Sequence, residues 1–177
     1  MRKEIQKKLR EKLLEDIHVP QFRLPSNIDI DENTRKEINE VDWENIEIDD
    51  AGNDGQSIVY LNVKLPIEKD VSEAIVLDVQ LVGKSEPHLY QPHINISKDL
   101  QGLGLAYKIY KKVISEFGHL YSGAGRRQNP LMDKIWNKLN DDPSMECHLS
   151  STSNICFNPE NPQKDEILDK IKKGPQN

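Results

Sequence analysis

Long apolar runs are missing from this chain of 177 residues, and aromatic side chains make up only 6% of it. No apolar stretch reaches the length that crosses a bilayer, and the first residues lack the apolar core of a secretion signal. Acidic side chains outnumber basic ones, and the formal net charge of −6 argues against a general nucleic-acid binder. We therefore expect a cytoplasmic protein with no membrane segment.

Cysteine is scarce as well, since Cys147 and Cys156 are the only two. They fall in neighbouring predicted strands and could face each other across a hairpin. Without an export signal, however, we expect reduced, buried thiols. The spacing around Cys147 does not fit a zinc site, and the acidic turn after Asp50 lacks the glutamate that an EF-hand requires. No metal is therefore expected.

Apolar periodicity predicts the order of the elements. Because a helix separates the fourth and fifth strands, these two strands should run parallel. Helices are predicted at 2–17, 33–41, 103–117, 129–139 and 164–173, and strands at 45–49, 57–65, 73–82, 88–97, 119–122, 145–150 and 153–157.

The order of these elements predicts a mixed α+β fold, in which helices flank an antiparallel meander followed by a parallel strand pair. Residues 1–25 form an N-terminal amphipathic helix and linker, 26–157 the main domain, and 158–177 a linker and short helix. The helix at 2–17 carries an apolar stripe that must pack on its own sheet or on another chain, so self-association or a protein partner is possible there.

The most informative stretch is Gln101-Gly102-Leu103-Gly104-Leu105-Ala106, which joins a predicted strand to a predicted helix. A glycine-rich turn at a helix N-terminus offers unpaired N–H groups and the positive end of the helix dipole, which suits a phosphate. The P-loop pattern is absent, and the third glycine of a dinucleotide fingerprint is missing. The alternative is a glycine-rich helix start that binds no ligand.

Gln101, Gly104 and Ala106 fit the pattern (Arg/Gln)-x-x-Gly-x-(Gly/Ala). With the order of elements over about residues 45–157, this motif resembles the coenzyme A pyrophosphate loop of the GCN5-related N-acetyltransferase (GNAT) superfamily. The resemblance implies a GNAT-like fold in which the parallel strand pair is splayed. It also implies transfer of an acetyl group from acetyl-CoA to an amine, which the sequence does not identify.

The resemblance also implies roles for particular residues. The backbone of the fourth strand would pair with the pantetheine arm of the cofactor, and Asn129 would contact the cofactor from the start of the next helix. Trp136 stands where the family often carries a tyrosine that protonates the leaving thiolate. The implied cofactor contacts are Ile94, Asn95, Ile96, Gln101, Gly102, Leu103, Gly104, Leu105, Ala106 and Asn129.

Glu86, His88 and His93 lie near where a general base could sit, and histidine titrates close to neutral pH. Tyr121 could replace the missing acid. Each of these residues could instead be an ordinary strand or core residue. Trp136 also keeps open a second interpretation, a GNAT-like domain with weak or no catalysis that serves as a binding or structural module. The small size and layout are similar to GNAT-like proteins encoded by bacteriophages, for which a virion or host-interaction role would follow.

Overall fold

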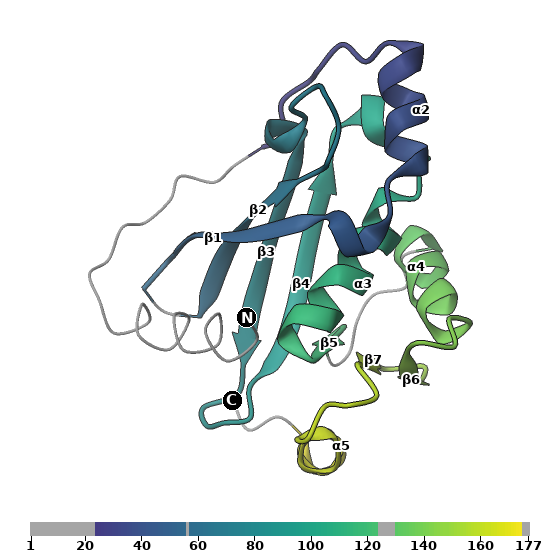
Figure 1. Cartoon of the computed structure of the whole chain (residues 1–177). Coiled ribbons are helices and arrows are strands. Elements are labelled where there is room, and N and C mark those ends of the chain that lie inside the picture. Colours follow the sequence, from purple (N-terminus) through teal and green to yellow (C-terminus); the bar gives the residue numbers. More distant parts are fainter. Residues whose placement is uncertain (1–23, 56, 124–129, 175–177) are drawn as a thin grey trace.

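The computed structural model describes residues 24–55, 57–123 and 130–174 (Figure 1). The helix predicted at 2–17, the partner contacts assigned to it, and Asn129 lie outside the described residues. The described part is a mixed α+β fold, as the sequence predicts. It contains a four-stranded antiparallel sheet and a three-stranded antiparallel sheet.

The four-stranded sheet is a meander whose strands lie in chain order. Its strands are β1 (Glu47–Asn53), β2 (Ile58–Lys64), β3 (Ile75–Val82) and β4 (Leu89–Ile96). The predicted strand at 45–49 is wrong at both ends, because a 3₁₀ turn occupies Trp43–Asn45 and β1 continues to Asn53. A register shift between Asp50 and Gly52 lets β1 stay paired through residues that resemble a turn.

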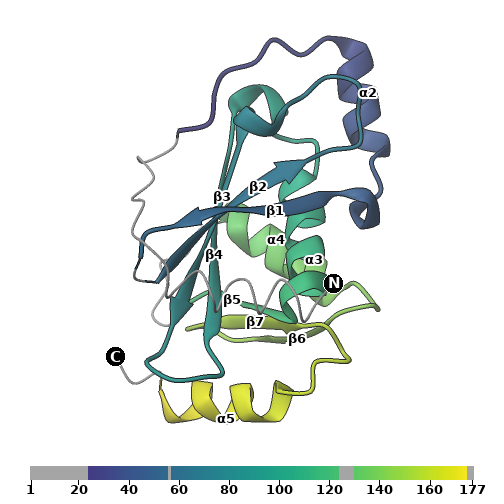
Figure 2. The ribbon, with the colours of Figure 1, turned by 60° about the vertical axis from the view of Figure 1, so that its left-hand side comes forward.

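The three-stranded sheet has the order β5-β7-β6. Its strands are β5 (His119–Tyr121), β6 (Glu146–Leu149) and β7 (Asn154–Phe157). Helix α5 (Lys164–Lys173) lies beneath this sheet and the β3–β4 turn (Figure 2). Its Ile167 is buried with Leu89, Ile155 and Phe157, so α5 closes a second, smaller apolar cluster.

Three further α-helices are described, all close to their predicted bounds. They are α2 (Glu32–Glu40), α3 (Leu105–Phe117) and α4 (Pro130–Asn140). Asp31 caps α2 by accepting a hydrogen bond from the Thr34 N–H, and Gly118 ends α3 at a φ of 93°. Two more 3₁₀ turns are described. The turn at Ser72–Ala74 precedes β3, and the turn at Lys98–Leu100 follows β4.

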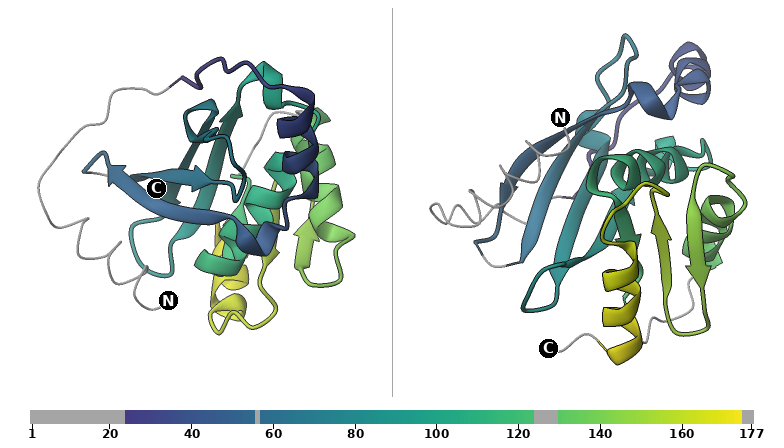
Figure 3. Two further views of the ribbon diagram at one scale, coloured as in Figure 1. Left: turned by 45° about the horizontal axis from the view of Figure 1, so that its top comes forward. Right: turned by 60° about the horizontal axis from the view of Figure 1, so that its bottom comes forward.

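The main core lies between one face of the meander and helix α3 (Figure 3). Alternate residues of β2 and β3 point into it, as the apolar alternation predicts. The buried set includes Val59, Leu61, Val63, Ile75, Leu77 and Val79 from the strands, and Ile109, Tyr110, Val113 and Ile114 from α3. The opposite face of the meander, called here the outer face, carries mostly polar side chains, such as Tyr60, Asp78 and His93.

Strand β5 pairs with β7 rather than with β4, so among the described strands β4 lies at the edge of its sheet. The two strands nevertheless approach each other near their first residues. The His119 Nε2 donates a hydrogen bond to the His88 carbonyl oxygen at 3.1 Å, and a Cβ on Gly123 would lie 3.0 Å from the Gln91 side chain. The first contact joins residues 88 and 119, and the second joins the later residues 91 and 123. Because both residue numbers increase, β4 and β5 run in the same direction, although they do not form a hydrogen-bonded ladder.

The prediction of reduced thiols is wrong, because Cys147 and Cys156 form a disulfide. The two residues are direct partners in the antiparallel register of β6 and β7, with a Cα–Cα separation of 4.1 Å. The hairpin geometry that the sequence predicts therefore places the two sulfur atoms together. Disulfides persist mainly in oxidising compartments.

We expect the double variant Cys147→Ala/Cys156→Ala to unfold at a lower temperature than the native chain. The crosslink joins residues 9 positions apart, and closing a loop of that size stabilises by about 2–3 kcal/mol in the chain-entropy account. Thermal melts with and without a reductant measure the effect. The double variant serves as the control, because its melt should not respond to the reductant. A native melt that is unchanged by reduction would contradict the prediction.

Candidate functional site

The Gln101–Ala106 loop forms an uncapped start to helix α3. Gly104 is the N-cap residue at a φ of 71°, Gly102 has a φ of 83°, and no side chain caps the helix. These two positive φ values are the reason the loop needs glycine. The first hydrogen bond of the helix runs from the Lys108 N–H to the Gly104 oxygen. Among the described residues, no acceptor is recorded for the backbone N–H groups of Gly102 through Tyr107.

The loop has open space beside its two glycines, which are exposed, since a Cβ built on Gly102 or Gly104 would meet no atom within 4 Å. The lysines of α3 are engaged elsewhere, for example Lys108 on the Asn39 oxygen at 2.9 Å and Lys112 on the Glu44 oxygen at 2.9 Å. An anion at this loop would therefore be held by backbone amides and the helix dipole.

The end of β4 that leads into this loop also has an unpaired edge. Ile94 and Ile96 pack against the main core, and Asn95 is exposed. Gln101 folds back, and its Nε2 donates to the Ile96 oxygen at 3.0 Å. Because β3 occupies the other edge of β4 and the Gln101 side chain takes the Ile96 oxygen, an extended ligand could pair as an added strand with the remaining groups of this edge, such as those of Ile94.

His93 is the predicted base candidate that lies on this part of β4. Its Nδ1 is 2.9 Å from an Asp78 carboxylate oxygen, and the two residues are cross-strand partners in β4 and β3. The hydrogen bond to Asp78 raises the pKa of His93 above its ordinary value. The His93 side chain is 49% exposed on the outer face, so a ligand can reach its imidazole.

Asp78 was missed by sequence reasoning, although its signal is present. Residues 78 and 93 both occupy polar positions of two neighbouring strands that alternate in hydropathy. Aligning those strands as an antiparallel hairpin would have paired the aspartate with the histidine.

The other three predicted catalytic residues lie away from the loop. Glu86 and His88 precede the first residue of β4, whose eight residues span about 25 Å. The His88 Nδ1 lies 3.0 Å from the Gly83 oxygen, which ties it into the β3–β4 turn. Tyr121 is 1% exposed within the second apolar cluster.

Trp136 is a core residue, 2% exposed, and its ring centroid lies 6.2 Å from that of Tyr110. Tyr110 is fully buried, and its hydroxyl has no hydrogen-bond partner among the described residues. Burial raises the pKa of this phenol, so the hydroxyl stays protonated.

We expect Tyr110→Phe to stabilise the fold, because it removes a buried hydroxyl that gains no hydrogen bond in the folded state. An unsatisfied buried polar group costs about 1–3 kcal/mol, so chemical denaturation should show a gain of that order at most. Tyr107→Phe is the matched control on the same helix. The Tyr107 hydroxyl donates to Asp142, and its loss should destabilise. A loss of stability in Tyr110→Phe would indicate a partner for that hydroxyl.

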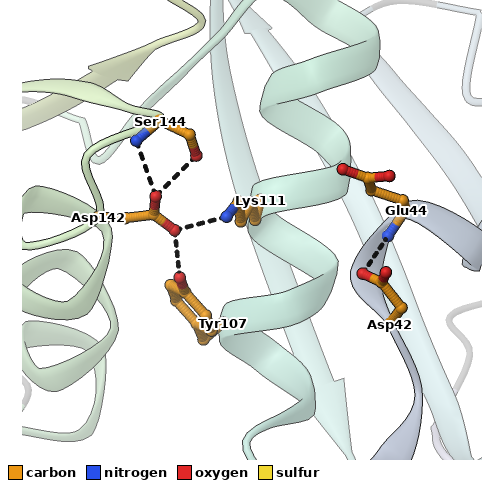
Figure 4. Close-up of polar contacts among 6 residues, drawn as sticks. All are labelled: Asp42, Glu44, Tyr107, Lys111, Asp142 and Ser144. Atoms are coloured by element: carbon orange, nitrogen blue, oxygen red, sulfur yellow. Dashed lines mark hydrogen bonds and ion pairs between the residues drawn. The ribbon is translucent and has the colours of Figure 1, made fainter.

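A partly buried polar cluster fixes α3 against the segment between α4 and β6 (Figure 4). Asp142 accepts hydrogen bonds from Lys111 at 2.6 Å, from Tyr107, and from Ser144. These donors hold the pKa of the Asp142 carboxyl well below its usual range, and burial with the hydrogen bond to Asp142 raises the pKa of Tyr107 to about 12. The Lys111 ammonium also lies 4.6 Å from the centroid of the Trp43 ring. Because all four polar groups are paired, this cluster serves packing.

No protein-family model matches the chain, and no curated protein is significantly similar to it. In the part of the chain that the structure describes, no helix is long and apolar enough to cross a membrane. Within the same residues, no group of three or more histidine, cysteine, aspartate or glutamate side chains is placed to hold a metal ion.

Proposed function

We propose that the chain is a GNAT-like N-acetyltransferase that transfers an acetyl group from acetyl-CoA to an amine. The observation that carries the proposal is the unpaired, uncapped N-terminus of α3 directly after the free edge of β4. Phosphate groups suit the first feature and the amides of the pantetheine arm suit the second. The order of the elements, a meander followed by β4, α3, β5, α4 and a β6–β7 hairpin, supports the same family.

The loop and strand would hold and orient the cofactor through backbone groups alone. The amides of Gly102 through Tyr107 would bind the pyrophosphate, and the free edge of Ile94–Ile96 would align the pantetheine arm. Asn129 keeps its proposed cofactor contact as a prediction. Holding two reactants in one geometry lowers the entropic part of the barrier.

His93 would act as the general base on the outer face. The nitrogen of the acceptor amine attacks the thioester carbonyl carbon, an N–C bond forms, and the C–S bond breaks. The neutral His93 imidazole takes the proton that the amine nitrogen loses, while the departing thiolate takes a proton from water. Asp78 would orient the ring and stabilise the imidazolium.

We expect the rate of acetyl transfer to rise with pH through the pKa of His93, since only the neutral imidazole accepts a proton. Asp78→Asn removes the hydrogen-bonded charge that raises this pKa, so the acidic limb of kcat/KM against pH should move to lower pH. His93→Gln should lower kcat by about 10²–10⁴-fold.

His88→Gln is the control for these variants, because His88 lies at the opposite end of β4. Thiol release from acetyl-CoA gives the rates. If the acidic limb of kcat/KM against pH stays at the same pH in Asp78→Asn, the His93–Asp78 pair does not take part in the mechanism.

The alternative is a GNAT-like domain without catalysis, acting as a binding or structural module in a virion or at a host protein. Trp136 favours it, because an indole at that position cannot supply the proton that a tyrosine would. Thiol release in the presence of acetyl-CoA and a mixture of primary amines separates the two proposals. Cofactor binding without turnover favours the module, and turnover favours the enzyme.

A further inference from the structure

A cavity of about 450 Å³ opens on the outer face of β2 and β3. Residues of β2 and β3 line it together with Leu24, Ser26, Ser72 and Glu73. The Ser26 N–H donates to the Glu73 oxygen at 2.8 Å, which joins the segment before α2 to the 3₁₀ turn before β3. A volume of this size suits a small molecule.

The polar lining of the cavity has a single charge sign. Among the described residues that line the cavity, Glu73 is the one charged side chain, and Ser26, Tyr60, Asn62 and Ser72 supply hydroxyl and amide groups. An anionic ligand would meet this carboxylate, and no basic side chain among the described lining residues offsets it. The lining therefore favours a cationic molecule that also carries hydrogen-bonding groups.

The cavity lies beside the His93–Asp78 pair on the same face of the sheet. Tyr60 lines the cavity and is the cross-strand partner of Asp78. Val76 also lines it, and it precedes Asp78 by two residues, or about 7 Å along the strand. A molecule in the cavity can therefore extend an amine toward the His93 imidazole.

We propose that this cavity binds the acyl acceptor, and that the acceptor is a small cationic molecule with a primary amine and hydroxyl or amide groups. The inference rests on the proposed acetyltransferase function and names the substrate class for the same site. One amine nitrogen lies near His93, while a second cationic or polar group of the acceptor contacts Glu73. On transfer the N–C bond forms, the C–S bond breaks, and the amine proton passes to His93 as described above.

Binding of a probe amine tests the inference without any need for turnover. Saturation-transfer NMR on the full chain compares 1,3-diamino-2-propanol, a hydroxylated cation, with aspartate, an anionic amine. We expect the native chain to bind the diamine and not aspartate. Val76→Trp fills the cavity and should weaken diamine binding at least tenfold. Gln80→Trp is its control, since Gln80 lies on the same strand and face but does not line the cavity.

Glu73→Lys provides a test that does not depend on repacking, because Glu73 is exposed and its replacement leaves the core untouched. The variant should lose the diamine, while Glu68→Lys, a charge reversal at an exposed residue outside the cavity, should bind it as the native chain does. Diamine binding that is unchanged in both Val76→Trp and Glu73→Lys would overturn the inference.

Isothermal titration with acetyl-CoA separates this inference from the proposed function. Val76→Trp should keep the native affinity for acetyl-CoA and lose turnover with the diamine. If the native chain does not bind acetyl-CoA, the proposed function and the acceptor role fall together, even where the diamine binds. If the native chain, Val76→Trp and Glu73→Lys all acetylate amines equally well, the result supports the proposed function and contradicts the inference that the cavity binds the acceptor.

Discussion

We expect acetyl-CoA to bind the native chain, and its affinity to fall by about fivefold or more when Ala106 is replaced by glutamate. Ala106 lies in the first turn of α3, among the N–H groups that would meet the pyrophosphate. A carboxylate there suits the helix dipole, so the fold should survive. Two like charges 4 Å apart repel by about 1–4 kcal/mol at a protein surface, and 1.4 kcal/mol corresponds to a tenfold change in affinity.

Ala106→Gln is the matched control, because it has almost the same shape without the charge. Isothermal titration of both variants with acetyl-CoA gives the comparison. Glutamate at Gly104 is a poorer test, since the φ of 71° strains any other side chain. Equal affinity in Ala106→Glu and Ala106→Gln would place the pyrophosphate elsewhere, and no heat with the native chain would contradict cofactor binding altogether.

Replacing Trp136 by alanine is expected to have the largest effect on stability. Trp136 is 2% exposed and packs against Tyr110 in the main core, and large-to-small changes of this kind cost about 3–5 kcal/mol. Trp136→Tyr keeps most of the buried ring and should cost less. If the proposed GNAT function holds, the variant also places a hydroxyl where that family often carries a tyrosine. Urea denaturation followed by circular dichroism measures both variants.

Lys134→Ala on the same helix is the control, because Lys134 is exposed and surface changes usually stay within about 0.5 kcal/mol. A Trp136→Ala variant as stable as Lys134→Ala would show that the indole is not a core anchor. A gain of thiol release in Trp136→Tyr would indicate that the native chain lacks a proton donor at this position.

The candidate site was predictable where its signal is local. Gly102 and Gly104 occupy positions with a positive φ, and Gly118 ends α3 with a positive φ. Glycine adopts such angles far more readily than other residues, so its presence in the sequence indicates these positions. The splayed strand pair that the resemblance implies stays a prediction. The partner of His93 was not predicted, because it depends on how β3 and β4 are aligned.

Local sequence by itself determined the described α-helices and the strands other than β1, since apolar periods of two and about 3.6 residues require one face of each element to be buried. Only the tertiary structure decided which side chains meet. The register of β3 and β4 joins Asp78 to His93, and that of β6 and β7 joins Cys147 to Cys156. The cavity under Leu24–Ser26 likewise exists only once distant segments pack. The reason is that a shift of one residue in a strand changes every cross-strand neighbour while leaving the local pattern intact.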